Sequence, residues 1–256
     1  MVQKIDVIAC LSDNYAYLLR DEESGASVVI DAPEAAPILA AVEASGERLD
    51  ALLLTHHHGD HIEGAAEIVG RTGARLIGAA ADAHRLPSLD RAVADGESFA
   101  IGPLGFRVIA TPGHTRGHVV YHAPSARALF SGDTLFSLGC GRLFEGSAAD
   151  MWDSLLRLAA LPHETSVYPG HEYTAANGRF ALSVDPDNAA LLERLAEVEA
   201  LRIANRPTVP VTLQRELLTN PFLRAGDPRL AERLGLAGQP AVDVFAELRR
   251  RKDAFR

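Results

Sequence analysis

The feature that most constrains the fold is a cluster of histidines and one aspartate that directly follows an apolar run. Residues 55–61 read THHHGDH after the apolar residues 51–54, and a helical pattern begins at Ile62. A buried strand that ends in such a cluster brings polar groups to the rim of a sheet, where they would stay unsatisfied without a partner. Imidazole and carboxylate are ligands that Zn²⁺ and similar cations accept. The cluster therefore predicts a metal site at a sheet edge.

The spacing inside the cluster predicts two groups of ligands. His56 and His58 are two residues apart in an extended segment, so their side chains point to the same side. Asp60 and His61 fall where the chain turns into the helix, so they can face a second point nearby. His57 lies between these ligands and faces the other way, so we expect it to support the site or to pack.

Three later residues complete the pattern, and each lies just past a predicted strand in a turn that contains glycine. They are His114 after 106–110, Asp133 after 128–130, and His171 after 166–168. Glycine lets the backbone bend close to a site. One such turn would be weak evidence, but three of them in this order after the histidine cluster are strong evidence that these residues complete the set of metal ligands.

Strand and helix patterns alternate through the first two-thirds of the chain. Short runs rich in β-branched and large apolar residues predict strands at 5–11, 15–19, 27–31, 51–55, 75–78, 106–110, 119–122, 128–130 and 166–168. Helical periodicity is found at 37–44, 62–72 and 148–161. This mixture, with hairpin-like neighbours early in the chain, predicts an α/β sandwich with mixed sheets.

The pattern changes at about Ala175, and the rest of the chain reads as helical. Apolar residues recur at helical spacing in 187–205, and 213–218, 229–234 and 241–251 also predict helices. We therefore predict an α/β domain over 1–174 and an all-helical domain over 175–256.

Charge and composition exclude several classes of protein. A net charge of −9 argues against a general nucleic-acid binder, which needs clustered cations. No apolar run reaches the roughly 18 residues of a membrane span, and the first residues do not resemble a signal peptide. Cys10 and Cys140 cannot build a disulfide framework. We expect a cytoplasmic monomer, in which the basic segment from Arg249 is either a solvated helix end or an anion site.

The order of the candidate ligands resembles the metallo-β-lactamase superfamily. HxHxDH, followed by a histidine, an aspartate and a histidine in glycine-containing turns, is the ligand series of that superfamily. The resemblance implies a four-layer αββα sandwich with a dinuclear site at one edge of the paired sheets. Two divalent ions are implied, with zinc expected, although these ligands also accept iron or manganese.

The same resemblance implies which residues hold each ion. The first ion would be bound by His56, His58 and His114, and the second by Asp60, His61 and His171. Asp133 would bridge both ions together with a hydroxide. Some superfamily members use a cysteine ligand, but the second site is already filled here, so we interpret Cys140 as non-ligating.

Three further segments narrow the resemblance to the glyoxalase II (hydroxyacylglutathione hydrolase) family. They are GCGRLFEG at 139–146, HEYT at 171–174, and the helical tail with NPFLR at 220–224 and RRRKDAF at 249–255. The similarity runs from Asp13 to Phe255. It implies hydrolysis of the thioester S-D-lactoylglutathione to glutathione and D-lactate, which is a step of methylglyoxal detoxification.

The family resemblance also implies the residues that bind the glutathione part of the substrate. They are Arg142, Leu143, Phe144, Tyr173, Arg249 and Lys252. Arg249 and Lys252 are three residues apart on a predicted helix, so both can meet one carboxylate. Some relatives have tyrosine where this chain has Phe144, so a contact from that hydroxyl is missing here.

In the implied mechanism, the bridging hydroxide attacks the thioester carbonyl and the metals stabilise the oxyanion before the thiolate leaves. Asp60 and Asp133 are the catalytic carboxylates of this scheme. Two alternatives stay open: a persulfide dioxygenase with one iron, and a regulatory protein with a vestigial site. The intact second site weighs against the first alternative, and the filled ligand positions weigh against the second.

Overall fold

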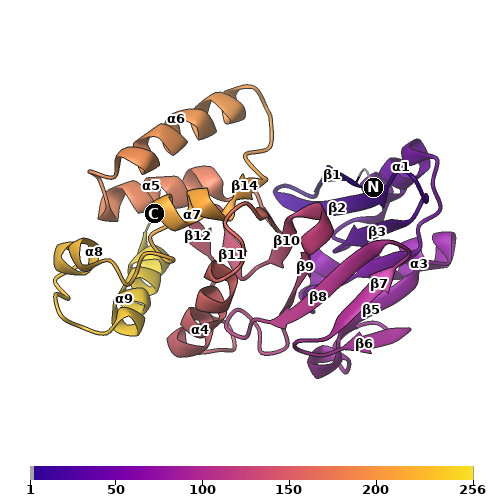
Figure 1. Cartoon of the computed structure of the whole chain (residues 1–256), viewed down its shortest axis with the longest axis horizontal. Helices are drawn as coiled ribbons and strands as arrows, with labels where there is room; N and C mark the ends of the chain where they lie inside the picture. The colour runs from indigo at the N-terminus through magenta and orange to yellow at the C-terminus, as the bar shows by residue number, and fades with distance from the viewer. Residues whose placement is uncertain (1–2, 256) are drawn as a thin grey trace. The chain divides into compact units, whose positions relative to one another are not determined.

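The structure is a computed structural model that describes residues 3–255 of the chain. It contains two compact units, and each is described by itself. The first unit comprises the residues up to Thr111 together with Arg116–Gly132. The second unit comprises Pro112–Thr115 and the residues from Asp133 onwards. Figure 1 labels the helices and strands of both units where there is room.

A six-stranded mixed sheet forms the centre of the first unit. Its strands follow the order β1-β2-β3-β4-β5-β6. They are β1 (Gln3–Cys10), β2 (Asn14–Asp21), β3 (Ser27–Ile30), β4 (Ala51–Leu53), β5 (Arg75–Ala79) and β6 (Arg91–Val93). The first three strands pair antiparallel, and β3 to β6 pair parallel. Every residue of β2, β3 and β4 is buried, so both faces of the sheet are covered along these strands.

Helices cover one face of this sheet. They are α1 (Ala35–Ser45) and α3 (Ala65–Thr72), and the short α2 (Gly59–Ile62) precedes α3. Ile38 of α1 and Ile68 of α3 share one apolar cluster with Leu18 and Leu52 of the sheet. Burying this face is the main source of stability for the layer, since apolar burial drives helix-on-sheet packing.

A second, antiparallel sheet packs on the other face. Within the first unit its strands follow the order β10-β9-β8-β7. They are β7 (Ser98–Ile101), β8 (Leu104–Ala110), β9 (Val119–Ala123) and β10 (Ala128–Gly132). The short 3₁₀ turn η2 (Pro124–Ala126) connects β9 to β10, and another, η1 (Ala80–Asp82), follows β5 of the first sheet. The Tyr17 and Phe130 rings meet between the sheets with their centroids 5.7 Å apart. The Tyr121 hydroxyl donates to the Leu54 carbonyl across the same layer at 2.9 Å.

The second unit combines a few short strands with helices. Its strands are β11 (Leu135–Phe136), β12 (Gly139–Cys140), β13 (Ser166–Pro169) and β14 (Val211–Thr212). Its helices are α4 (Ala148–Ala159), α5 (Thr174–Val184), α6 (Ala189–Ile203), α7 (Leu213–Thr219), α8 (Pro228–Arg233) and α9 (Ala241–Ala254). The predicted helical character after residue 174 is confirmed, and the two-residue β14 is an addition that the sequence pattern does not show.

Aromatic rings form the core of the helical part. Phe222 lies between Phe180 and Phe245, with ring centroids 5.8 and 5.9 Å away. Trp152 of α4 extends this series, because its ring centroid lies 5.9 Å from that of Phe245. The α/β class with mixed sheets and a helical C-terminal part is therefore confirmed in the described residues.

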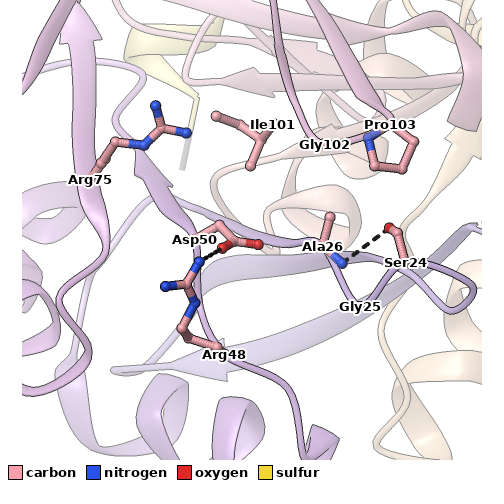
Figure 2. Close-up of a pocket in the computed structure, with 9 residues that line it drawn as sticks. All are labelled: Ser24, Gly25, Ala26, Arg48, Asp50, Arg75, Ile101, Gly102 and Pro103. Carbon is pink, nitrogen blue, oxygen red and sulfur yellow. Dashed lines mark hydrogen bonds and ion pairs between the residues drawn. The ribbon is translucent and has the colours of Figure 1, made fainter.

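A hollow of about 350 Å³ lies in the first unit where the parallel strands begin. Arg75 opens β5 there, and Arg48 pairs with Asp50, which precedes β4, at 2.6 Å (Figure 2). The histidine cluster follows the other end of β4. The hollow and the histidine cluster thus belong to opposite ends of the same strand.

Among the described residues, no helix is both long and apolar enough to cross a membrane.

Candidate metal centre

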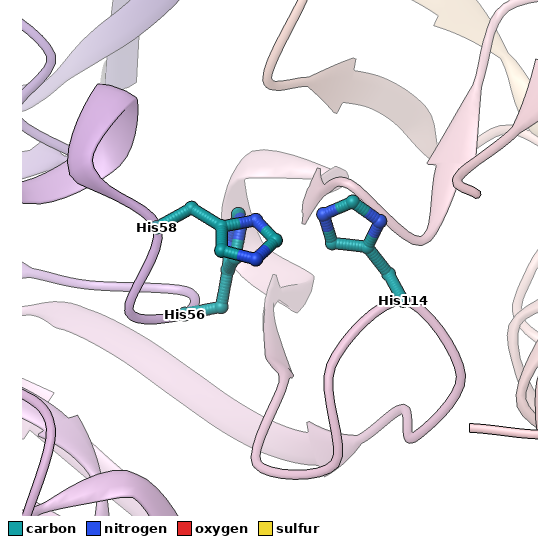
Figure 3. A group of neighbouring side chains, drawn as sticks. All are labelled: His56, His58 and His114. Atoms are coloured by element: carbon teal, nitrogen blue, oxygen red, sulfur yellow. The ribbon is translucent and has the colours of Figure 1, made fainter. Parts of the chain in front are cut away.

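The loop after β4 carries four of the predicted ligands. His56 Nε2 and His58 Nδ1 lie 3.1 Å apart, and the His56 and His61 ring centroids are 4.2 Å apart. His56 and His61 are fully buried, whereas His58 and Asp60 are partly exposed. Figure 3 shows His56 and His58 on this loop and also draws His114 on its own turn. The structure therefore brings the histidines of the cluster together, as their spacing predicts.

A buried carboxylate holds one of these histidines. Asp31 follows β3 and accepts the Thr55 amide and hydroxyl at 2.8 and 2.9 Å. Its Oδ2 also lies 2.9 Å from His61 Nδ1. A carboxylate on one ring nitrogen keeps the proton there and leaves the other nitrogen to bind a metal. Sequence reasoning missed Asp31, and the available signal was an aspartate directly after an apolar strand.

Asn14 has a similar supporting role that the sequence did not reveal. Its Nδ2 donates to the Asp60 carbonyl at 2.9 Å and to Asp60 Oδ2 at 3.2 Å. These bonds connect the second strand to the ligand loop and fix the direction of the Asp60 carboxylate.

Two other histidines pack around the loop. The His118 ring stacks on the His56 ring with their centroids 4.8 Å apart, and Thr111 Oγ1 lies 2.9 Å from His118 Nδ1. His57 Nδ1 lies 3.0 Å from the buried carboxylate of Asp82. The His57 imidazole is therefore engaged with a carboxylate on η1.

The remaining three predicted ligands meet in the second unit. Asp133 Oδ2 lies 3.4 Å from His114 Nε2 and 3.5 Å from His171 Nε2. His114 Nδ1 donates to the Arg142 carbonyl at 2.9 Å, which leaves Nε2 to bind a metal. One carboxylate thus lies between two imidazoles, which is the arrangement that a bridging ligand needs.

The chemistry of the donors fits transition-metal ions. The seven side chains supply five imidazoles and two carboxylates, and each offers an atom suited to metal binding. Borderline cations such as Zn²⁺ accept this set, and so do iron and manganese. Gly141 shows how closely the backbone approaches Asp133, because a Cβ atom at position 141 would lie 1.9 Å from the Asp133 carbonyl oxygen.

Two of the predicted substrate residues flank the ligands of the second unit. The Phe144 side chain is 63% exposed, and its ring centroid lies 5.2 Å from that of His114. The exposed Tyr173 ring stacks on His171, with the centroids 4.6 Å apart and the rings 5° from parallel. These rings offer an apolar surface beside the ligands. Leu143, which lies between Arg142 and Phe144 in the sequence, is partly buried, whereas Arg142 is exposed.

The two basic residues of α9 lie in different environments. Arg249 is buried, and its guanidinium donates to the Cys140 carbonyl at 2.9 Å and to Asp253 Oδ1 at 2.8 Å. Lys252 is partly buried, and its ammonium donates to the Ala176 carbonyl at 3.3 Å. Burial lowers the pKa of Lys252 to about 8, and the charges of Arg249, Arg179 and Arg142 add to this effect.

Two family models match the chain, and together they account for most of it. The model described as the metallo-beta-lactamase superfamily matches residues 12–171. The model described as hydroxyacylglutathione hydrolase C-terminus matches residues 172–255.

Curated relatives are similar over the full length. A hydroxyacylglutathione hydrolase from Methylococcus capsulatus is 55% identical over 249 residues, which cover 97% of each chain. One from Ruegeria pomeroyi is 52% identical over 255 residues, which cover 100% of both chains. Among solved structures, TTHA1623 in a di-iron-bound form is 27% identical with a TM-score of 0.62, covering 85% of this chain and 98% of its own.

Proposed function

Because the chain belongs to the hydroxyacylglutathione hydrolase family of the metallo-β-lactamase superfamily, we propose that it hydrolyses S-D-lactoylglutathione to glutathione and D-lactate. This thioester hydrolysis is the glyoxalase II step of methylglyoxal detoxification. The observation that carries the proposal is the full-length similarity to hydroxyacylglutathione hydrolases, which includes both the ligand loops and the helical part.

The proposed cofactor is a pair of divalent ions, with zinc preferred. His56, His58 and His114 would hold one ion, and Asp60, His61 and His171 would hold the other, with Asp133 shared between them. Support comes from the donor set, from the buried carboxylate on His61, and from the carboxylate between His114 and His171. When bound, two such ions would lower the pKa of water to about 7 and stabilise negative charge on a carbonyl oxygen.

Hydrogen bonds within the chain determine which ring nitrogen of His61 and of His114 carries the proton, and they orient the Asp60 carboxylate. Asp31 Oδ2 and the Arg142 carbonyl each accept from an imidazole Nδ1. Asn14 holds one oxygen of Asp60. We propose that Asp60 orients the attacking water. We propose that Asp133 is the ligand that both groups of metal-binding residues share. Preorganised groups of this kind cost no reorganisation when the reaction occurs.

The proposed contacts to glutathione are made by Arg142, Leu143, Phe144, Tyr173, Arg249 and Lys252. Glutathione thioesters carry two carboxylates, so the exposed Arg142 and the ammonium of Lys252 offer the complementary charge. Phe144 offers an apolar face next to His114 without a hydroxyl. Arg249 is buried, and its guanidinium already donates to the Cys140 carbonyl and to Asp253, so it has the least capacity of the six for a direct contact to the substrate.

We also propose that residues 1–174 form the catalytic domain, that residues 175–256 bind glutathione, and that the protein acts as a monomer in the cytoplasm. Both cysteines are free and buried, which suits a reducing compartment. The excess of negative charge disfavours nucleic acid as a partner.

The test is thiol release from S-D-lactoylglutathione, with elemental analysis of the same sample. We expect release of one thiol per thioester and close to two transition-metal ions per chain. One tightly bound iron, together with oxygen consumption on glutathione persulfide, would instead identify a dioxygenase and overturn the proposal.

A further inference from the structure

The turn between β11 and β12 is held by side chains that come from distant helices. Asn220, at the end of α7, donates from Nδ2 to the carbonyls of Phe136 and Gly139 at 3.1 and 3.0 Å. Glu216 of α7 accepts the Ser137 hydroxyl and the Leu138 amide, both at 2.8 Å. Glu216 and Asn220 therefore form hydrogen bonds to the turn 136–139, although they lie 78 to 84 positions away in sequence.

Two more side chains extend this set. Asn177 of α5 donates to the Ser137 carbonyl at 3.2 Å. Arg249 of α9 donates to the Cys140 carbonyl at 2.9 Å. Three helices thus contribute to the binding of a single hairpin.

Burial and backbone conformation show that these contacts define the turn. Glu216, Asn220 and Leu138 are fully buried. Leu138 adopts a left-handed conformation, with a φ of 58°, which a leucine seldom occupies in the absence of surrounding constraints. Its side chain packs against Ala181 and Leu191 of the helices. Glu216 and Asn220 also bond to each other at 3.0 Å, so they act as one unit.

The hairpin leads directly into the metal ligands of the second unit. Asp133 lies two residues before β11, and Arg142, whose carbonyl accepts from His114 Nδ1, lies two residues after β12. The Phe136 ring packs against His171 and Tyr173, with centroid distances of 5.9 and 5.3 Å. A shift of the hairpin would therefore move the surroundings of His114, Asp133 and His171 together.

We propose that Glu216 and Asn220 are positioning residues that fix hairpin 135–140 and thereby set the metal affinity of the ligands beside it. The helical part then has a second task besides the proposed binding of glutathione. This inference rests on the proposed metal centre, but it makes no use of the substrate.

The test compares three variants with the unchanged protein. Glu216→Gln keeps the size of the side chain and removes its charge, and Asn220→Asp removes the two donors and places a carboxylate beside Glu216. Asn220→Ser is a milder change, which serves if Asn220→Asp does not fold. Glu247→Gln is the matched control, since Glu247 pairs with Arg250 and Arg251 on its own helix.

Zinc affinity is measured by competition with a chromogenic chelator, and the melting temperature is measured with and without bound metal. We expect zinc binding to weaken by about tenfold or more in the Glu216 and Asn220 variants, the scale found when supporting residues of metal sites are changed. The gain in melting temperature on metal loading should shrink, whereas Glu247→Gln should keep both values. Turnover should fall at nearly constant KM.

The opposite pattern would overturn the inference. It would consist of equal losses of melting temperature with and without metal, with unchanged zinc affinity and unchanged turnover per folded molecule. A purely structural role of the turn would give that result. The chelator titration uses no thioester, so a protein that binds zinc tightly but does not cleave S-D-lactoylglutathione would contradict the proposed function and leave this test intact.

Discussion

The two groups of candidate ligands are built in different ways. In the first unit, four ligands come from a single loop after β4, within residues 56–61. In the second unit, His114, Asp133 and His171 come from three separate turns that are 19 and 38 residues apart in the numbering. The first group owes its shape to local chain geometry, whereas the second depends on long-range contacts.

This difference decides how each group responds to change. A short loop that ends a buried strand has few alternative conformations, and Asp31 after β3 and Asn14 of β2 anchor it. The second group is anchored through the hairpin 135–140, which itself depends on three helices. We therefore expect changes in the helices to disturb the second group and to leave the first intact.

The largest effect should come from Asp133→Ala, which removes the carboxylate between His114 and His171. Changing a residue that only supports a metal ligand typically lowers activity by up to roughly 100-fold, so the loss of turnover in Asp133→Ala should exceed that factor. The metal content should also drop. Steady-state kinetics and elemental analysis measure both. Two bound metals with near-normal turnover would show that this residue does not bridge the centre.

A smaller loss is expected for Asp31→Ala, which tests the local group. His61 would lose the acceptor for its Nδ1 proton, so activity or metal affinity should fall by about 10- to 100-fold. Asp31→Asn keeps an acceptor without the charge, so its zinc affinity and activity should lie between those of Asp31→Ala and those of the unchanged protein. Unchanged zinc affinity in Asp31→Ala would mean that the loop keeps its geometry unaided.

Lys252→Ala should have a milder effect that is confined to substrate binding. A charge-assisted hydrogen bond contributes about 1.5–3 kcal/mol, so KM for S-D-lactoylglutathione should rise roughly tenfold at little cost in kcat. A small neutral thioester serves as the control and should be cleaved as before. Equal losses on both substrates would mean that α9 supports the fold rather than binding glutathione.

The smallest effect concerns pH and the same ammonium group. The pKa of Lys252 is lowered to about 8, mainly by burial, so the group is charged below that pH and neutral above it. KM for the glutathione thioester should therefore rise between pH 7 and 9, by no more than Lys252→Ala produces at pH 7. The Lys252→Ala variant should show no such rise. A rise of equal size in the variant would assign the titration to another group.

Much of the fold was predictable because the relevant signals are local. Strand patterns identify β1 to β5, β8, β9, β10 and β13, and helical periodicity identifies the helices after residue 174. The strands that went unpredicted are short, such as β11, β12 and β14 with two residues each. A two-residue strand is defined by its hydrogen bonds to the neighbouring strand, and it is too short to show a periodic pattern in its own sequence.

The same limit applies to the residues around the ligands. The ligand types and their order could be recognised directly, and the resemblance supplied the roles. Asp31, Glu216 and Asn220 act through contacts 24 to 84 residues away in sequence, which no local pattern encodes. The start of α6 illustrates the local uncertainty, since the pattern suggested Asp187 and the helix begins at Ala189 after the cap Asn188.

The two buried cysteines have a practical consequence for measuring this enzyme. Burial raises the pKa of both Cys10 and Cys140 to about 11, so only a very small fraction of either thiol is ionised near neutrality. Colorimetric disulfide reagents react with thiolates, and access to buried sulfur is slow as well. A continuous assay with such a reagent should therefore record the glutathione set free and almost nothing from the protein, even at high enzyme concentration.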